Sequence, residues 1–147
     1  MNFPNPSQRL RETIRLLIRK LGVLERSEAI CCGITLTQCH TIVEIGRKKQ
    51  ISVNELAELL NLDKSTISRT VEQLVTHDMI VREPDPNDRR YVTLQLTSKG
   101  EQLFGDIEER MQAYFTEILE IIPEEKREQV IDSLQIFSEA LHNKRCC

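Results

Sequence analysis

The residues from Asp63 to Leu74 carry side chains that can contact nucleic acid. A surface helix normally carries Glu and Lys for solubility, whereas this stretch concentrates hydroxyl, cationic and amide groups. Such groups reach phosphate oxygens and base edges. A generic surface helix of an all-α domain is the alternative interpretation of this stretch alone. The side chains predicted to contact DNA are Lys64, Ser65, Thr66, Ser68, Arg69 and Gln73.

This polar stretch has the pattern of the second helix in a helix-turn-helix. Asp63 is a good N-cap for it. Upstream, Ser52 and Glu55 form a capping box for a shorter helix over residues 53–60, and residues 61–63 make a three-residue connection. Two short helices joined in this way are typical of helix-turn-helix proteins. The apolar stripe of the second helix, at i, i+4 and i+7, consists of Ile67, Val71 and Leu74.

A β-hairpin is expected directly after these two helices. Residues 79–82 are mostly apolar, and residues 85–88 have turn chemistry. Residues 91–96 alternate with period two, which predicts a strand with Val92, Leu94 and Leu96 on one face. A helix-turn-helix followed by a hairpin is a winged helix. Its tip carries Arg89 and Arg90, which would lie near the minor groove.

Amphipathic helices are expected before the helix-turn-helix. Apolar residues at helical spacing predict a helix over residues 7–24, with Ser7 as its cap. Residues 27–33 are expected to form a linker. A second helix is expected over residues 35–46, and the basic cluster at residues 47–49 suits its C-terminal end.

The C-terminal part of the sequence predicts two more helices, over residues 98–122 and from Pro123 to about Asn143. Together they carry more apolar surface than the chain itself can cover, which suggests a helical dimer interface. An intramolecular bundle with the first helix is the alternative. We therefore predict a mainly α single chain with a small β-hairpin wing. Its winged helix-turn-helix lobe spans residues 35–97, and its helical dimerisation region comprises residues 7–30 and 98–143.

Composition narrows the class of protein. The net charge is −3, but the first 50 residues carry +5 and the last 47 carry −6. A basic DNA-binding footprint must therefore come from local clusters at residues 47–49 and 89–90. No apolar run is long enough to span a bilayer or to act as a secretion signal, so a cytoplasmic protein is expected. No glycine-rich loop, paired carboxylates or metal-ligand spacing points to an enzyme, a cofactor or a metal.

Four of the five cysteines are candidates for a thiol sensor: Cys31, Cys32, Cys146 and Cys147. An odd number of cysteines does not indicate a disulfide framework. In a head-to-head helical dimer, the C-terminus of one chain can lie near the first helix of the other, so the two pairs could meet across subunits. Inert surface thiols and a soft-metal or metalloid site are the alternatives. Cys39 is expected to be a small buried hydrophobe.

The sequence resembles the MarR (multiple antibiotic resistance regulator) family of bacterial transcription factors over nearly its whole length. The most specific segments are VNELAELL (53–60), DKSTISR (63–69), and DPNDRR (85–90) running into LTSKG (96–100). The resemblance implies a homodimer with two winged-helix lobes on a pseudo-palindromic operator in double-stranded DNA. It also implies a small-molecule or thiol sensor between lobes and dimer region. In such wings Asp88 would pair with Arg90 and shape the tip, leaving Arg89 also able to enter the minor groove.

We therefore expect a sequence-specific transcriptional regulator, acting as a repressor that a small-molecule or oxidant signal releases from its operator. Two alternatives stay open. One is a winged-helix module that binds proteins and no DNA, and the other is a regulator that responds to a soft metal or metalloid.

Overall fold

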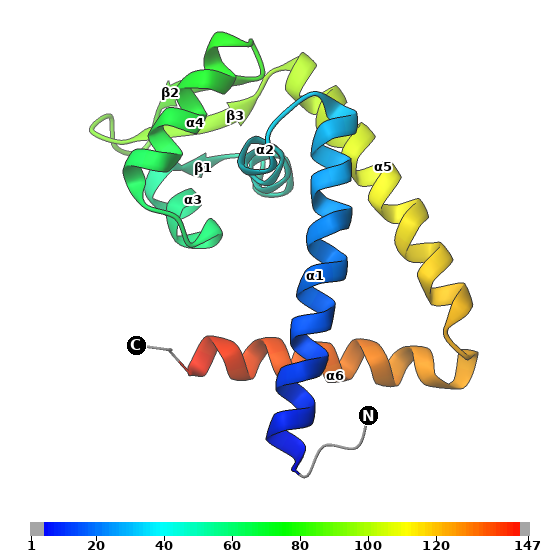
Figure 1. Cartoon of the computed structure of the whole chain (residues 1–147). Coiled ribbons are helices and arrows are strands. Elements are labelled where there is room, and N and C mark those ends of the chain that lie inside the picture. The colour runs from blue at the N-terminus through cyan, green and yellow to red at the C-terminus, as the bar shows by residue number, and fades with distance from the viewer. Residues whose placement is uncertain (1–4, 145–147) are drawn as a thin grey trace. The chain divides into compact units, whose positions relative to one another are not determined.

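The computed structural model of the chain describes residues 5–144, apart from the side chains of residues 24, 25 and 27–32. The fold is mainly helical with a small antiparallel sheet, as the sequence predicts (Figure 1). The chain divides into two compact units between Ile107 and Glu108. The elements are α1 (Pro6–Cys32), α2 (Leu36–Lys48), β1 (Ile51–Ser52), α3 (Val53–Leu60), α4 (Lys64–Thr76), β2 (Ile80–Pro84), β3 (Val92–Leu96), α5 (Ser98–Ile121), the 3-10 turn η1 (Glu124–Lys126) and α6 (Arg127–Asn143).

The first unit contains the helix-turn-helix, formed by α3 and α4, and its core. Full burial of a Leu, Ile or Val side chain contributes about 1.5–3 kcal/mol, so the buried side chains at the centre dominate its stability. The predicted stripe of α4 is confirmed as part of this core. The aliphatic side chains that are at most 1% exposed are Ile42, Ile45, Leu56, Ile67, Val71, Leu74, Ile80 and Leu94.

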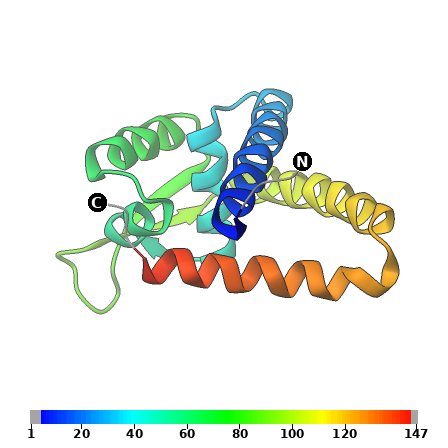
Figure 2. The same cartoon turned by 60° about the horizontal axis from the view of Figure 1, so that its bottom comes forward.

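The sheet has the strand order β1-β3-β2, and both pairings are antiparallel. The two predicted strands are confirmed as β2 and β3. The short β1, which pairs Ile51 with Leu94, was not predicted because two residues carry no readable pattern. The loop between β2 and β3 projects from the sheet as the wing (Figures 1 and 2).

The predicted alternation of β3 is wrong at its first residues. Val92 is 42% exposed, whereas Thr93 is only 6% exposed. Thr93 is buried because its hydroxyl has partners on both sides. Its Oγ1 accepts a hydrogen bond from Nε2 of Gln50 over 2.9 Å and donates to the carbonyl of Glu83 over 3.2 Å.

The linker predicted over residues 27–33 is wrong, because α1 continues to Cys32. Gly22 does not interrupt the helix, and the chain leaves it at Gly33, which has a φ of +71°. At the other end, the Asn5 side chain accepts from the backbone N–H of Gln8 over 2.8 Å. Asn5 therefore caps α1 in place of Ser7, whose hydroxyl also donates to Asn5.

The first turn of α5 is in close contact with the turn that precedes β2. Thr97 caps it, since Oγ1 accepts from the backbone N–H of Gly100 over 3.0 Å. A Cβ added to Gly100 would lie 2.2 Å from the carbonyl oxygen of Met79. A Cβ added to Gly46 in α2 would lie 2.6 Å from the ring of Phe104 in α5. The missing side chains of these two glycines are what lets α5 approach the lobe.

The second unit consists of the end of α5, η1 and α6. Pro123 ends α5, as predicted, but the predicted start of the last helix at Pro123 is wrong, because a 3-10 turn comes first and α6 begins at Arg127. Nε of Arg127 donates to the carbonyl of Ile122 over 3.0 Å, which satisfies an acceptor beyond the helix end. No residue of α6 is buried, although the helix carries Leu134, Ile136 and Leu141.

Among the helices of residues 5–144, none combines the length and the apolar character that crossing a membrane would require.

Candidate nucleic-acid interface

The first turn of α4 is organised around the carboxylate of Asp63. Its Oδ2 accepts from the backbone N–H of Thr66 over 3.0 Å, and its Oδ1 accepts from the Thr66 hydroxyl over 2.7 Å. The hydroxyl of Ser65 also donates to Asp63. These bonds, that of Ser65 first, hold the pKa of Asp63 below its ordinary value of 3.8. The carboxylate is therefore ionised at neutral pH, as an N-cap at a helix dipole should be.

This cap changes what two predicted contacts can do. Ser65 and Thr66 direct their hydroxyl hydrogens to Asp63. In this arrangement they keep only acceptor lone pairs, and a phosphate needs a donor. Ser65 and Thr66 therefore contribute first to the shape of α4, and would donate to DNA only after leaving Asp63.

The outer face of α4 carries the other predicted contacts. Lys64, Ser68, Arg69 and Gln73 are all exposed. Within the described part of the chain, the side chains of Lys64, Ser68 and Arg69 make no hydrogen bond or ion pair. Gln73 differs, since its Oε1 accepts from Nε2 of Gln38 over 3.1 Å. Two cations and one hydroxyl group on the outer face of α4 are therefore available to bind a polyanion.

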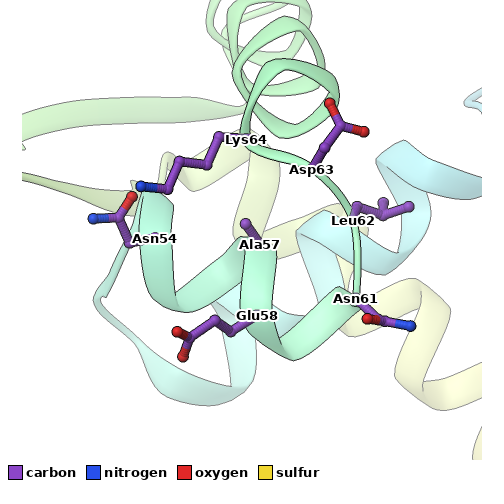
Figure 3. Close-up of a pocket in the computed structure, with 7 residues that line it drawn as sticks. All are labelled: Asn54, Ala57, Glu58, Asn61, Leu62, Asp63 and Lys64. Carbon is purple, nitrogen blue, oxygen red and sulfur yellow. The ribbon is translucent and has the colours of Figure 1, made fainter. Parts of the chain in front are cut away.

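The turn between α3 and α4 is held by Asn61, which adopts the left-handed conformation with a φ of 54°. An open hollow of about 560 Å³ lies beside it (Figure 3). Only two of its lining residues are apolar, so it lacks the enclosed apolar lining typical of a small-molecule site. The lining residues are Asn54, Ala57, Glu58, Asn61, Leu62, Asp63 and Lys64.

The wing tip contains the expected pair between Asp88 and Arg90. Nη2 of Arg90 donates to Oδ2 of Asp88 over 2.8 Å, and Nε donates to Oδ1 over 3.0 Å. The guanidinium lowers the pKa of Asp88, and the carboxylate raises the pKa of Arg90. Arg89 is exposed, and no described residue pairs with its guanidinium. The pair therefore occupies one wing arginine and leaves the other available.

The base of the wing is tied to the end of α4. Arg82 in β2 forms an ion pair with Glu72 in α4. Oγ1 of Thr97 donates to the carbonyl of Asp78 over 2.6 Å, and Nζ of Lys99 donates to the carbonyl of His77 over 3.1 Å. Sequence reasoning missed these contacts, because an ion pair or a hydrogen bond between two elements has no signal in local spacing. Their bonds fix the wing beside α4.

The predicted thiol sensor consists of cysteines whose side chains the structure does not describe. The side chains of Cys31 and Cys32, and the whole of Cys146 and Cys147, lie outside the described residues. Cys39 is 8% exposed in the lobe core, which confirms the expectation of a small buried hydrophobe. Where side chains are described, no three His, Cys, Asp or Glu residues lie close enough together to hold a metal ion.

Comparisons with known proteins agree with this geometry. The model of the MarR family matches residues 33–90. The transcriptional regulator BilQ of Clostridium symbiosum is 31% identical, over 70% of this chain and 72% of its own. The fold is similar to that of Streptococcus pneumoniae FabT in complex with DNA (TM-score 0.82, 22% identity, 94% of this chain and 99% of that one). It is also similar to that of NadR in complex with 4-hydroxyphenylacetate (TM-score 0.74, 22% identity, 93% and 96%).

A winged helix-turn-helix with an exposed polar second helix and an arginine-bearing wing defines a class of DNA-binding transcription regulators. Within that class, the chain belongs to the MarR family, which is not a family of enzymes.

Proposed function

We propose that the protein is a repressor that binds a pseudo-palindromic operator as a homodimer. The observation that carries the proposal is the pairing pattern of its cations. Lys64 and Arg69 on α4 and Arg89 on the wing are exposed and unpaired among the described residues, whereas Arg90 is held by Asp88. Unpaired cations on two adjoining elements match the phosphates of a duplex without first breaking an internal bond.

In this proposal α4 enters the major groove. Lys64 would contact phosphates, while Ser68, Arg69 and Gln73 would reach base edges. Ser65 and Thr66 would shape the first turn and donate to phosphate only where Asp63 releases them. Arg89 would enter the minor groove beside α4, with Asp88 and Arg90 holding the tip of the loop in shape.

The homodimer is proposed because of the exposed apolar side chains of the flanking helices. In α1, Leu10 is 48% exposed and Ile18 is 65% exposed; in α6, Ile136 is 68% exposed and Leu141 is 58% exposed. Monomeric proteins rarely leave apolar helix faces of this kind exposed to solvent. A two-fold dimer built from residues 7–30 and 98–143 would present two lobes, each spanning residues 35–97, to half-sites about one DNA turn apart.

Release from the operator would follow from a ligand that binds one lobe spacing better than the other. A small molecule is one such signal, supported by the bound 4-hydroxyphenylacetate of the structural neighbour NadR. An oxidant acting on Cys31, Cys32, Cys146 or Cys147 is the other, and a soft metal or metalloid is an alternative for the same thiols. An operator-bound repressor acts in the cytoplasm, where we place the protein.

The test is to select bound duplexes from a random pool and to titrate the selected duplex at several salt concentrations. We expect Arg69→Ala and Arg89→Ala each to weaken binding about tenfold or more. Lys64→Ala should flatten the dependence of log Kd on log salt, because it removes a phosphate contact. Lys144→Ala in the second unit removes the same charge and serves as the control. Unchanged affinity in both arginine variants would contradict the proposed interface. A chain that selects no duplex would favour the protein-binding alternative.

A further inference from the structure

One hydrogen bond connects the N-terminal cap of α2 to a side chain of α4. Nε2 of Gln38 donates to Oε1 of Gln73 over 3.1 Å, between residues 35 positions apart in the sequence. Both residues belong to the first compact unit. Gln73 is exposed and is one of the side chains proposed above to reach base edges. The orientation of its amide therefore bears on which base it can read.

The cap of α2 fixes which end of the Gln38 amide faces Gln73. The backbone N–H of Thr35 donates to Oε1 of Gln38 over 3.0 Å, and Thr35 Oγ1 accepts from the backbone N–H of Gln38 over 3.2 Å. This reciprocal pair is a complete capping box. A backbone N–H can only donate, so the amide oxygen of Gln38 must face Thr35. The NH₂ group is then the part that reaches Gln73.

The same logic fixes the amide of Gln73. The NH₂ group of Gln38 is a donor, so Gln73 must turn its oxygen toward α2. The oxygen keeps a second lone pair, but it is directed at α2, so the donors of the NH₂ group are what Gln73 offers to DNA. A glutamine that reads adenine with two bonds must offer an acceptor and a donor together. With its oxygen engaged by Gln38, Gln73 instead matches an edge made of acceptors, which in the major groove is that of guanine.

We propose that Gln38 is a positioning residue that sets the base preference of Gln73, and that this preference is for guanine. Gln38 acts without touching DNA, by holding one end of the Gln73 amide. The inference rests on the proposed function, because it requires that α4 contacts the bases of a duplex.

Gln38→Glu tests this role with a nearly isosteric change. A carboxylate at this position keeps the capping box, since it accepts from the Thr35 N–H as the amide oxygen does. It has no hydrogen to donate to Gln73. Gln73 must therefore turn its NH₂ group toward α2 and present its oxygen to DNA. An oxygen matches the donor groups of cytosine N4 or adenine N6.

The experiment measures Kd for full-length protein on selected duplexes that carry each of the four base pairs at each position. Gln73→Ala identifies the position that Gln73 reads, because the preference disappears there. At that position we expect guanine facing α4 to be favoured about tenfold in the unmodified protein. Gln38→Glu should reverse the preference toward cytosine or adenine by a similar factor. The added negative charge weakens all duplexes alike, so the ratio of Kd values isolates the effect.

Gln38→Ala serves as the second variant, which keeps the test decisive if the carboxylate variant binds too weakly. It leaves Gln73 able to present either end, so the preference should fall to within about twofold. Thermal unfolding followed by circular dichroism verifies that each variant is folded. An unchanged preference in both Gln38 variants, or no position at which Gln73→Ala has an effect, would overturn the role of Gln38. Failure of the unmodified protein to bind any duplex would instead overturn the proposed DNA binding.

Discussion

At the start of α4, a single carboxylate determines how two polar residues are arranged. Asp63 accepts hydrogen bonds from Ser65 and Thr66, so the hydroxyl groups of a stretch rich in donors are partly used within the helix. At the wing, Asp88 does the same to Arg90. In both places an acidic residue selects which neighbouring groups remain for a ligand. Among the cations without such a partner, which are Lys64, Arg69 and Arg89, the two arginines are the ones we expect to matter most for DNA.

The cap at Asp63 makes stability depend on pH. Because the pKa of Asp63 is lowered on folding, its contribution is fully present above the ordinary value of 3.8 and is lost as the pH falls below it. Asp63→Asn keeps an N-cap that cannot ionise. We expect the advantage of the unmodified protein over this variant to shrink between about pH 5 and about pH 2. Urea unfolding of both proteins at several pH values measures it, and a difference that stays constant would contradict the assignment.

Among the elements, α5 can take its position because Gly100 in its first turn has no side chain. Gly100 lies so close to the carbonyl group of Met79 that no side chain larger than a hydrogen atom fits at this position. Thr97 reinforces the same junction, since its hydroxyl accepts from Gly100 and donates to Asp78. The junction joins the end of α4, the start of β2 and the first turn of α5. This contact thus acts together with the bonds at the base of the wing to hold the wing beside α4.

Two glycines of α5 provide a matched test of that contact. Gly100→Ala would force a methyl group against the Met79 carbonyl, and we expect the free energy of unfolding to fall by about 1–3 kcal/mol. Gly105→Ala, where the added Cβ meets no atom within 4 Å beyond the neighbouring backbone of its own helix, should raise it by about 1 kcal/mol through helix propensity. Denaturant unfolding of the two variants gives both values. Equal effects of the same sign would show that the contact is not restrictive.

At the scale of the whole molecule, the described side chains leave a large apolar surface on the flanking helices. Helix α6 buries none of its residues, and Ile121 at the end of α5 is 80% exposed. The net charge falls along the chain, from +5 over the first 50 residues to −6 over the last 47. An exposed apolar surface within an acidic segment favours association with a second copy of the chain over contact with DNA.

The proposed dimer predicts a specific response to charge. Leu134 and Leu141 lie seven residues apart on one face of α6, and both are at least half exposed. We expect the double variant Leu134→Asp with Leu141→Asp to sediment as a monomer at concentrations where the unmodified chain is a dimer. Leu59→Asp with Leu62→Asp adds the same charges to exposed positions of the helix-turn-helix and should leave the dimer intact. A dimer that survives the α6 substitutions would place the interface elsewhere.

Much of this fold could be predicted because its signals are local. The stripe of Ile67, Val71 and Leu74 and the cap at Asp63 each lie within three turns of helix, where spacing alone is informative. The extent of α1 was mispredicted because weak signals, a glycine and a pair of cysteines, suggested a break that helix continuity overrides. The two-residue β1 depends on a pairing partner 43 residues away and has no local pattern.

The candidate site divides in the same way. The residue types of α4 and of the wing were predictable, but the partners that orient them were not. Gln38 contacts Gln73 across 35 residues, and Arg82 contacts Glu72 between a strand and a helix. Such contacts depend on how elements pack, which the periodicity of one element does not contain.

The close approach of Gly46 to the ring of Phe104 has a consequence for how this family can diverge. The aromatic ring fills the volume that a side chain at residue 46 would need. Neither residue can therefore change alone without a cost: a methyl group at residue 46 requires a smaller group at residue 104, and a smaller group at 104 leaves a void unless residue 46 grows. In relatives that keep this contact between α2 and α5, we expect residues 46 and 104 to change together. The combined volume of the two side chains would then be maintained, rather than the identity of either residue.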